Sequence, residues 1–238
     1  MVKVAEKTLE IDCTRRTTSE VNKAIYAGLE RGQSVMVRNP ASRHNLGVGI
    51  NHPGKVVFDG NVGYFCAGML KHADVEVRGN CGWSVGEDMM SGSIVVRGNA
   101  SAAAGAAIRG GILVVHGNAG PRTGISMKGG AIIIGGNVDY MSGFIMQKGV
   151  FIICGNTGEA LADSMYEGKV YVRGKVAEFG NDAVTAELTA EDKALLRDLL
   201  TKYKVAGIPK PTEFTKIVSG KKLYNFNMKD YELWRVAL

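Results

Sequence analysis

Residues 94–118 read IVVRGNASAAAGAAIRGGILVVHGN, in which a short apolar run followed by Gly and Asn returns after 19 residues. The pattern extends in both directions without insertions. A strict repeat of this length is typical of a solenoid, in which each repeat forms one coil. Seven leading glycines lie 19 residues apart, and an asparagine follows six of them: Gly60, Gly79, Gly98, Gly117, Gly136, Gly155 and Gly174, with Asn61, Asn80, Asn99, Asn118, Asn137 and Asn156.

A triplet that is apolar at its first and third positions precedes each leading glycine, as Ile94, Val95 and Val96 precede Gly98 with one residue between. Side chains alternate along a strand, so the first and third residues of a triplet should point into the coil. Coils stacked in register pair each strand in parallel with its counterpart in the next coil. The sequence therefore predicts an all-β solenoid, a right-handed parallel β-helix with 19-residue coils and short N- and C-terminal helices. We expect the asparagine column to form a stacked amide ladder.

The second residue of each triplet should face outward, and on five successive coils it is apolar. Monomeric proteins rarely leave a continuous apolar stripe open to water. We therefore predict that the C-terminal segment or another subunit covers this stripe, which is a possible interface. Its members are Val95, Val114, Ile133, Ile152 and Tyr171.

The glycines inside a repeat follow Gly-x-x-Gly-x-x-x-Gly, most fully at Gly79, Gly82 and Gly86. We expect glycine where the backbone takes a positive φ or passes close to the neighbouring coil. A large apolar residue also stands ten positions after each leading glycine, often Met, which fills irregular gaps in a core. This second inward row contains Leu70, Met89, Ile108, Met127, Met146 and Met165.

Three segments follow from the extent of the repeat: a capping segment with a helix (1–33), the β-helix (34–183) and a helical, aromatic tail (184–238). Thr17 and Glu20 form a capping box before a helix at about 18–31, and Thr189 and Asp192 form another. The second helix has an apolar face of Leu195, Leu196, Leu199, Leu200 and Tyr203. We expect the aromatic residues beyond it to dock on the solenoid or on a neighbour: Phe214, Tyr224, Phe226, Tyr231 and Trp234.

Charge and cysteine content exclude several classes of protein. The net charge of +6 is dispersed, and no run interleaves basic and aromatic residues as a nucleic-acid channel would. No stretch approaches the 18 apolar residues of a membrane span. The four cysteines, Cys13, Cys66, Cys81 and Cys154, form no CxxC pair. This composition favours a reduced, cytoplasmic protein with Cys66 and Cys154 as small core residues.

Catalytic, cofactor-binding and metal-binding residues are not expected in this chain. Its carboxylates do not share one column, so they do not form the acid pair of a glycosidase. The four histidines occupy different coil positions, and the glycine pairs lack the Lys-Ser/Thr of a phosphate loop. One polar column precedes the leading glycines, and two interpretations of its arginines remain open: contact with a partner's acidic patch, or solvated edges. The column contains Arg38, Asp59, Arg78, Arg97, His116, Gly135, Cys154 and Arg173.

The repeat and its flanks resemble a known family. The Gly-x-x-Gly-x-x-x-Gly β-helix is similar to the C-terminal GXGXG domain of the large subunit of glutamate synthase. The flanking sequences at 39–44, 63–69, 87–92, 124–129 and 222–226 look like the free-standing version of this domain. That version is a separate subunit of split glutamate synthases and of N-methylglutamate synthase.

This resemblance implies a structural subunit without catalytic residues. It would join a class II glutamine amidotransferase subunit to a synthase subunit that carries FMN and an iron–sulfur cluster, and a homo-oligomer is possible. The sequence agrees with this implication. A class II amidotransferase needs an N-terminal Cys nucleophile, which Met1 does not provide, and the cysteines form no cluster for an iron–sulfur centre. The alternative is a scaffold that resembles the β-helical subunit of a formylmethanofuran dehydrogenase complex, against which the segment 222–226 counts. A third is an autonomous β-helical enzyme, against which the missing carboxylate groove counts.

Overall fold

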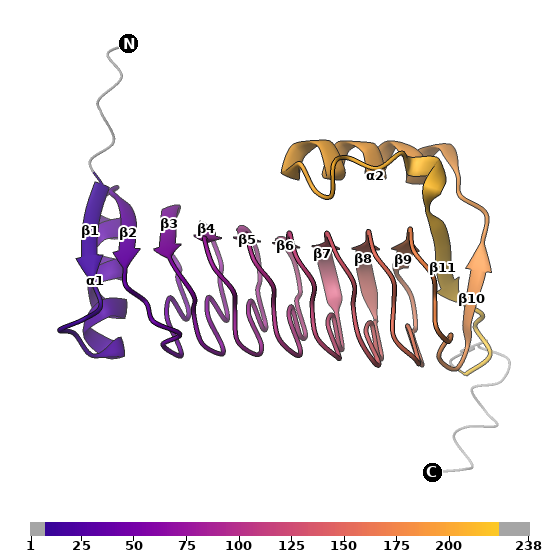
Figure 1. Ribbon diagram of the computed structural model, residues 1–238, viewed down its shortest axis with the longest axis horizontal. Helices are drawn as coiled ribbons and strands as arrows, with labels where there is room; N and C mark the ends of the chain where they lie inside the picture. Colours follow the sequence, from indigo (N-terminus) through magenta and orange to yellow (C-terminus); the bar gives the residue numbers. More distant parts are fainter. Residues whose placement is uncertain (1–7, 224–238) are drawn as a thin grey trace, which may run out of the picture.

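The computed structural model describes residues 8–223, in which eleven strands form one continuous sheet (Figure 1). Strands β1 to β9 pair in chain order and in parallel, and β11 and then β10 extend the sheet in antiparallel orientation. The strands are β1 (Thr8–Asp12), β2 (Ser34–Arg38), β3 (Gly54–Asp59), β4 (Ala73–Val77), β5 (Ser93–Val96), β6 (Ile112–Val115), β7 (Lys128–Ile134), β8 (Lys148–Ile153), β9 (Lys169–Val172), β10 (Ala183–Ala186) and β11 (Thr215–Ser219). The predicted all-β solenoid is confirmed.

Neighbouring coils stack in the register that the repeat predicts. Ile94 pairs with Leu113, Leu113 with Ile132 and Ile132 with Phe151, so equivalent residues lie side by side. The first and third residues of the triplets are buried in one continuous core, as alternation requires. The second inward row is also confirmed, since Leu70, Met89, Ile108, Met127, Met146 and Met165 are all fully buried.

The three glycines of the Gly-x-x-Gly-x-x-x-Gly repeat stack into three columns along the solenoid, and glycine is required in them for two different reasons. A Cβ on Gly155, in the leading column, would lie 2.5 Å from the carbonyl carbon of Gly136 in the preceding coil. A Cβ on Gly82, in the second column, would lie 2.6 Å from the backbone of Gly63. The third column instead needs positive φ, as at Gly86 (+67°) and Gly105 (+65°). Close approach of neighbouring backbones therefore fixes the first two columns, and backbone conformation fixes the third.

Each coil also holds residues other than glycine in the left-handed region. In the coil that begins at Gly98, Ala103, Gly105 and Ala107 all have positive φ. The amides of Ala103 and Ala107 donate to carbonyls of the next coil, and that of Gly105 donates to the preceding coil. These inter-coil hydrogen bonds offset the roughly 1–2 kcal/mol that a left-handed residue costs. The same three positions repeat in the coils that begin at Gly60, Gly79, Gly117, Gly136 and Gly155.

The asparagine ladder differs from the expected amide stack. The Oδ1 of each asparagine accepts a hydrogen bond from the backbone amide one coil further on, as from Asn80 to Asn61 (2.8 Å). Only one bond between side-chain amides occurs in residues 8–223, from Asn99 Nδ2 to Asn80 Oδ1 (3.3 Å). The prediction of an amide stack was wrong in this respect. The absent Cβ of the next leading glycine lets each oxygen approach the backbone closely. The same bond joins Asn99, Asn118, Asn137, Asn156 and Lys175 to the preceding asparagine.

At the N-terminal end, α1 (Thr18–Glu30) closes the core. Its predicted capping box is present, because the Thr17 side chain accepts from the Glu20 amide and the Glu20 carboxylate accepts from Thr17. Strand β1, which the sequence analysis missed, pairs with β2 ahead of the first coil. Its residues carry no copy of the repeat, so only the pairing reveals the strand.

At the C-terminal end, α2 (Ala190–Tyr203) lies along the outside of the sheet above β6 to β9 (Figure 1). Its capping box, Thr189 with Asp192, is present as predicted. A short 3-10 helix, η1 (Pro211–Glu213), leads into β11, and Phe214 is buried. The antiparallel pair β10–β11 was not predicted. The predicted docking of Tyr224, Phe226, Tyr231 and Trp234 concerns residues outside the described range. No helix between residues 8 and 223 is long and apolar enough to cross a membrane.

Candidate functional site

The apolar stripe on the outer face of the sheet lies mostly beneath α2. Val114, Ile133, Ile152 and Tyr171 are fully buried in a second cluster with Leu196 and Leu200 of α2. Val205 and Phe214, which follow α2, complete the cluster. Val95 lies at its margin and remains half-buried. The sequence predicted that either the C-terminal segment or another subunit covers the stripe. In the structure the C-terminal segment of the same chain covers it.

A buried carboxylate holds α2 on the sheet. Asp192 accepts hydrogen bonds from Tyr171 (2.6 Å), Lys216 (2.7 Å) and Lys169 (2.9 Å), and its Oδ2 also caps α2 at Thr189. Burial alone would raise the pKa of Asp192, but the bonds from Lys216, Tyr171 and Lys169 outweigh it and hold that pKa well below its usual value. Burial, then the Asp192 hydrogen bond and charge, raise the pKa of Tyr171 far above its usual value. The carboxylate therefore stays ionised and joins three elements.

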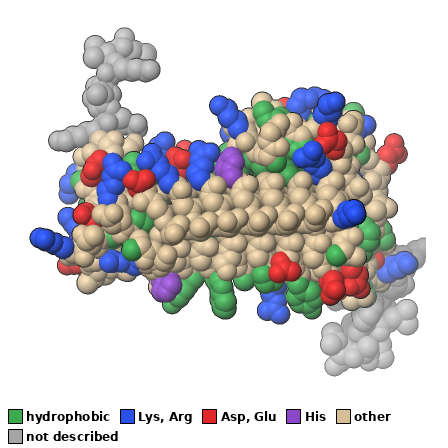
Figure 2. All heavy atoms as spheres, in the orientation of Figure 1, with side chains coloured by type: hydrophobic (Ala, Val, Ile, Leu, Met, Phe, Trp, Pro, Cys, Tyr) green, Lys and Arg blue, Asp and Glu red, His purple; other side chains and the backbone are tan. Residues whose placement is uncertain are grey.

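The arginines of the polar column that precedes the leading glycines form ion pairs with carboxylates of the same chain. Asp59 bridges Arg38 and Arg78, with Arg78 at 3.2 Å, and Glu10 lies 3.1 Å from Arg38. Arg97 contacts Glu76 (2.9 Å) and His116 (3.1 Å), and Arg173 pairs with Glu213 (2.7 Å). Carboxylates of the same chain thus satisfy these arginines. Figure 2 shows the row of alternating charges along the upper edge beside α2.

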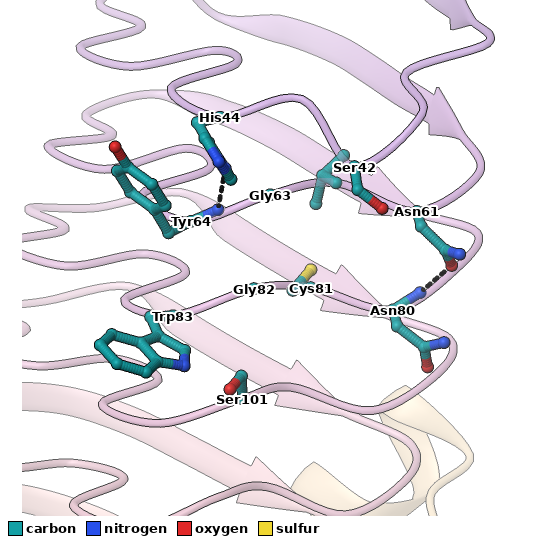
Figure 3. Close-up of a pocket in the computed structure, with 11 residues that line it drawn as sticks. Ser42, His44, Asn61, Gly63, Tyr64, Asn80, Cys81, Gly82, Trp83 and Ser101 are labelled. Atoms are coloured by element: carbon teal, nitrogen blue, oxygen red, sulfur yellow. Dashed lines mark hydrogen bonds between the residues drawn. The ribbon is translucent and has the colours of Figure 1, made fainter.

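A groove of about 660 Å³ crosses the first coils, on the side where the chain turns away from the sheet. Tyr64 and Trp83 rise beside it from equivalent positions of adjacent coils (Figure 3). Hydrophobic side chains also protrude along the lower edge of the solenoid in Figure 2. The groove is lined by Ser42, His44, Asn61, Val62, Gly63, Tyr64, Asn80, Cys81, Gly82, Trp83 and Ser101.

Glycine shapes one wall of this groove. The His44 ring stacks on the Tyr64 ring with centroids 3.9 Å apart, and its Nδ1 accepts a hydrogen bond from the Tyr64 amide (3.1 Å). A Cβ on Gly63 would overlap that Nδ1, so the stack requires glycine there. The sequence analysis missed the groove, although Tyr64 and Trp83 each follow the second glycine of a repeat by one residue. That shared position was the signal available.

Metal ligation and thiol chemistry can be checked directly in residues 8–223. Residues 8–223 contain no group of three His, Cys, Asp or Glu side chains that could hold a metal ion. The cysteines are free and buried, and burial raises the pKa of Cys66 and of Cys154 to about 12. A protonated, buried thiol is a poor nucleophile and a poor ligand.

Stacked glycine-rich coils, an asparagine column and a helix along one face define a parallel β-solenoid. Comparison with known proteins gives the family. The family model described as the GXGXG motif matches residues 13–213. Protein GlxC of Rhizobium meliloti (strain 1021) is 48% identical over 227 residues, which cover 94% of this chain and 99% of the relative. The chain belongs to the GXGXG motif family.

Proposed function

We propose that this chain is the structural subunit of a glutamate synthase-type complex, either a glutamate synthase or an N-methylglutamate synthase. It joins a class II glutamine amidotransferase subunit to a synthase subunit that carries FMN and an iron–sulfur cluster, and it holds no catalytic residue or cofactor itself. The complex is cytoplasmic.

One observation carries the proposal. The GXGXG match spans residues 13–213, and the solenoid with its two caps occupies that whole range. The match covers 99% of the relative's length, so in that protein nearly the whole chain is this domain. A stack of coils with a polar outer edge and little chemistry of its own suits a subunit that positions others.

The test reconstitutes the complex from three separately purified chains. With all three present, we expect glutamine-dependent formation of glutamate or N-methylglutamate. Without this chain, we expect the amidotransferase to hydrolyse glutamine and the flavin subunit to keep its spectrum, while the coupled reaction is lost. Flavin or iron–sulfur absorbance in this chain alone would overturn the proposal, as would an unchanged coupled reaction in its absence.

A further inference from the structure

We propose that residues 224–238 of this chain close the C-terminal end of the solenoid by covering Val176 and Phe179. This inference goes beyond the proposed function, because it concerns the chain by itself and needs no partner subunit. Three observations support it: an inward column that ends in an exposed ring, a backbone amide without a partner, and the place where the described chain ends.

One inward column of the solenoid ends in an exposed aromatic ring. Phe179 belongs to this column, because its backbone pairs in parallel with that of Leu161 one coil earlier. Phe179 is nevertheless 40% exposed, since no further coil covers it within residues 8–223. The hydrophobic core therefore reaches the surface at this end. The six earlier members of the column are each at most 1% exposed: Cys66, Val85, Ala104, Thr123, Ser142 and Leu161.

A second inward column ends in the same turn. Its amides donate to carbonyls of the next coil, as Ala119 does to Asn137 (2.9 Å) and Thr157 to Lys175 (2.9 Å). Val176, which pairs with Thr157, is only half-buried, and no hydrogen bond from its amide occurs within residues 8–223. Backbone donors at the edge of a core need an acceptor. A further stretch of backbone across this end would supply one.

The N-terminal end of the same core is closed. Ile11 of β1 is 1% exposed and lies in the core with Val21 and Ile25 of α1. At the C-terminal end, β10 and β11 extend the sheet (Figure 1), but the turn formed by residues 174–182 belongs to neither strand. Solenoids need a cap at each end, because the last repeat would otherwise expose its apolar face. The described residues thus provide one full cap and one partial cap.

The chain itself continues from the uncovered turn. The amides of Lys222 and Leu223 donate to the Asp182 carboxylate (3.0 and 3.2 Å), and Asp182 stands three residues after Phe179. Leu223 is itself 48% exposed. Residue 224 therefore begins beside the turn, and a short tether gives such a segment a roughly millimolar effective concentration there. A separate chain has no such advantage, so the tether favours residues 224–238 as the cover.

The composition of residues 224–238 suits this place. The segment has 15 residues, and α1, which closes the other end, has 13. Its two basic and two acidic residues balance, so it would bring no net charge onto an apolar surface. More than half of its residues are apolar or aromatic: Tyr224, Phe226, Met228, Tyr231, Leu233, Trp234, Val236, Ala237 and Leu238.

The experiment replaces Phe179 by photoreactive benzoylphenylalanine in the purified full chain, followed by irradiation and peptide mapping. An equal mixture of unlabelled and isotope-labelled chains shows whether a cross-link joins one chain or two. We expect a cross-link to residues 224–238 within one chain. The matched control is the same replacement of Tyr64, which is 47% exposed at the other end of the solenoid and should not cross-link to that segment. A cross-link from position 179 to a second copy, to another segment or to nothing would overturn the inference.

Deletion of residues 224–238 gives an independent measurement. We expect hydrogen exchange at the amides of residues 174–182 to rise roughly tenfold, while β4 to β6 stay unchanged. Phe179→Ala should have a smaller effect on this exchange in the deleted chain than in the full chain, because the two changes remove one contact. Tyr140→Ala, at another exposed ring, should act equally in both chains.

Two results of the deletion would contradict the inference: unchanged exchange at residues 174–182, or equal effects of Phe179→Ala in the two chains. Both experiments use the chain by itself. Their failure would therefore leave the subunit role standing, and failure of the three-chain reconstitution would leave this cap standing.

Discussion

The outer face of the sheet has two halves built on the same repeat. Over β2 to β5, the outward positions in the middle of the strands hold Met36, Val57, Glu76 and Val95. Over β6 to β9, they hold Val114, Ile133, Ile152 and Tyr171, all under α2. The inward positions of the triplets are apolar and buried in both halves. The outward residues at the strand centres therefore determine which coils α2 packs on. The inward residues form the core of every coil and do not distinguish the covered coils from the others.

The two columns that flank the strand centre also differ between the halves. Before the strand centre, Lys55, Asp74 and Ser93 give way to Ile112, Ala131 and Val150. After it, Arg38, Asp59, Arg78 and Arg97 are followed by His116, and the column is small only at Gly135 and Cys154 before Arg173 ends it. A Cβ on Gly135 would lie 2.3 Å from the carbonyl oxygen of His116 and 3.2 Å from Val205, so the preceding coil and the segment after α2 both restrict this position to a small residue. The column before the strand centre thus becomes apolar where the cover begins, and the column after it is small only beside the segment that follows α2.

The largest loss of stability is expected when the buried charge of Asp192, which holds α2 on the sheet, is removed. Asp192→Asn removes the charge that Lys216 and Lys169 face, and breaking a buried ion pair costs about 3–5 kcal/mol. We expect α2 to detach while the coils remain, with increased binding of a hydrophobic dye and a helix that unfolds at lower denaturant. Asp198→Asn, an exposed position of the same helix, is the control. Equal stability of the two variants would show that Asp192 does not hold α2.

Low pH should destabilise the contact of α2 with β6 to β9. The folded pKa of Asp192 lies below its unfolded value, so its stabilising contribution is complete at neutral pH. It is lost progressively as the pH falls below about 4, toward the folded pKa. Hydrogen exchange should show α2 losing protection during acidification before the buried strands β5 to β8. In Asp192→Asn this separate step should be missing, and its persistence there would assign it to another group.

A smaller effect is expected from Tyr171→Phe. The hydroxyl donates to Asp192 at 2.6 Å, and a hydrogen bond to a charged group contributes about 1.5–3 kcal/mol. The ring stays in place, so the variant should lower the stability of the covered half without detaching α2. Tyr203→Phe serves as the matched control because no hydrogen bond from its hydroxyl occurs in residues 8–223. Equal melting curves for the two variants would contradict this assignment.

Much of this architecture could be predicted from the sequence, because coil stacking is local and periodic. The spacing of Gly60 to Gly174 fixes the register, and the apolar row from Leu70 to Met165 fixes the second wall of the core. Features outside the period were lost: β1 and the β10–β11 pair depend on contacts between segments that share no repeat. The groove was missed because Tyr64 and Trp83 interrupt a column that has no aromatic residue in the next two coils.

The smallest effect is expected in the open half. Glu76 lies 2.9 Å from Arg97 and 3.9 Å from Lys55; its own side chain is 20% exposed, but both basic side chains are at least half exposed, so water and salt reach the pairs. Exposed ion pairs contribute about 0.2–1 kcal/mol and are screened by salt. Glu76→Gln should therefore lower the melting temperature only slightly, and high salt should abolish the difference. Because the same strand-centre position under α2 is fully buried, a large, salt-independent loss would mean that the β2–β5 half also lies beneath a cover.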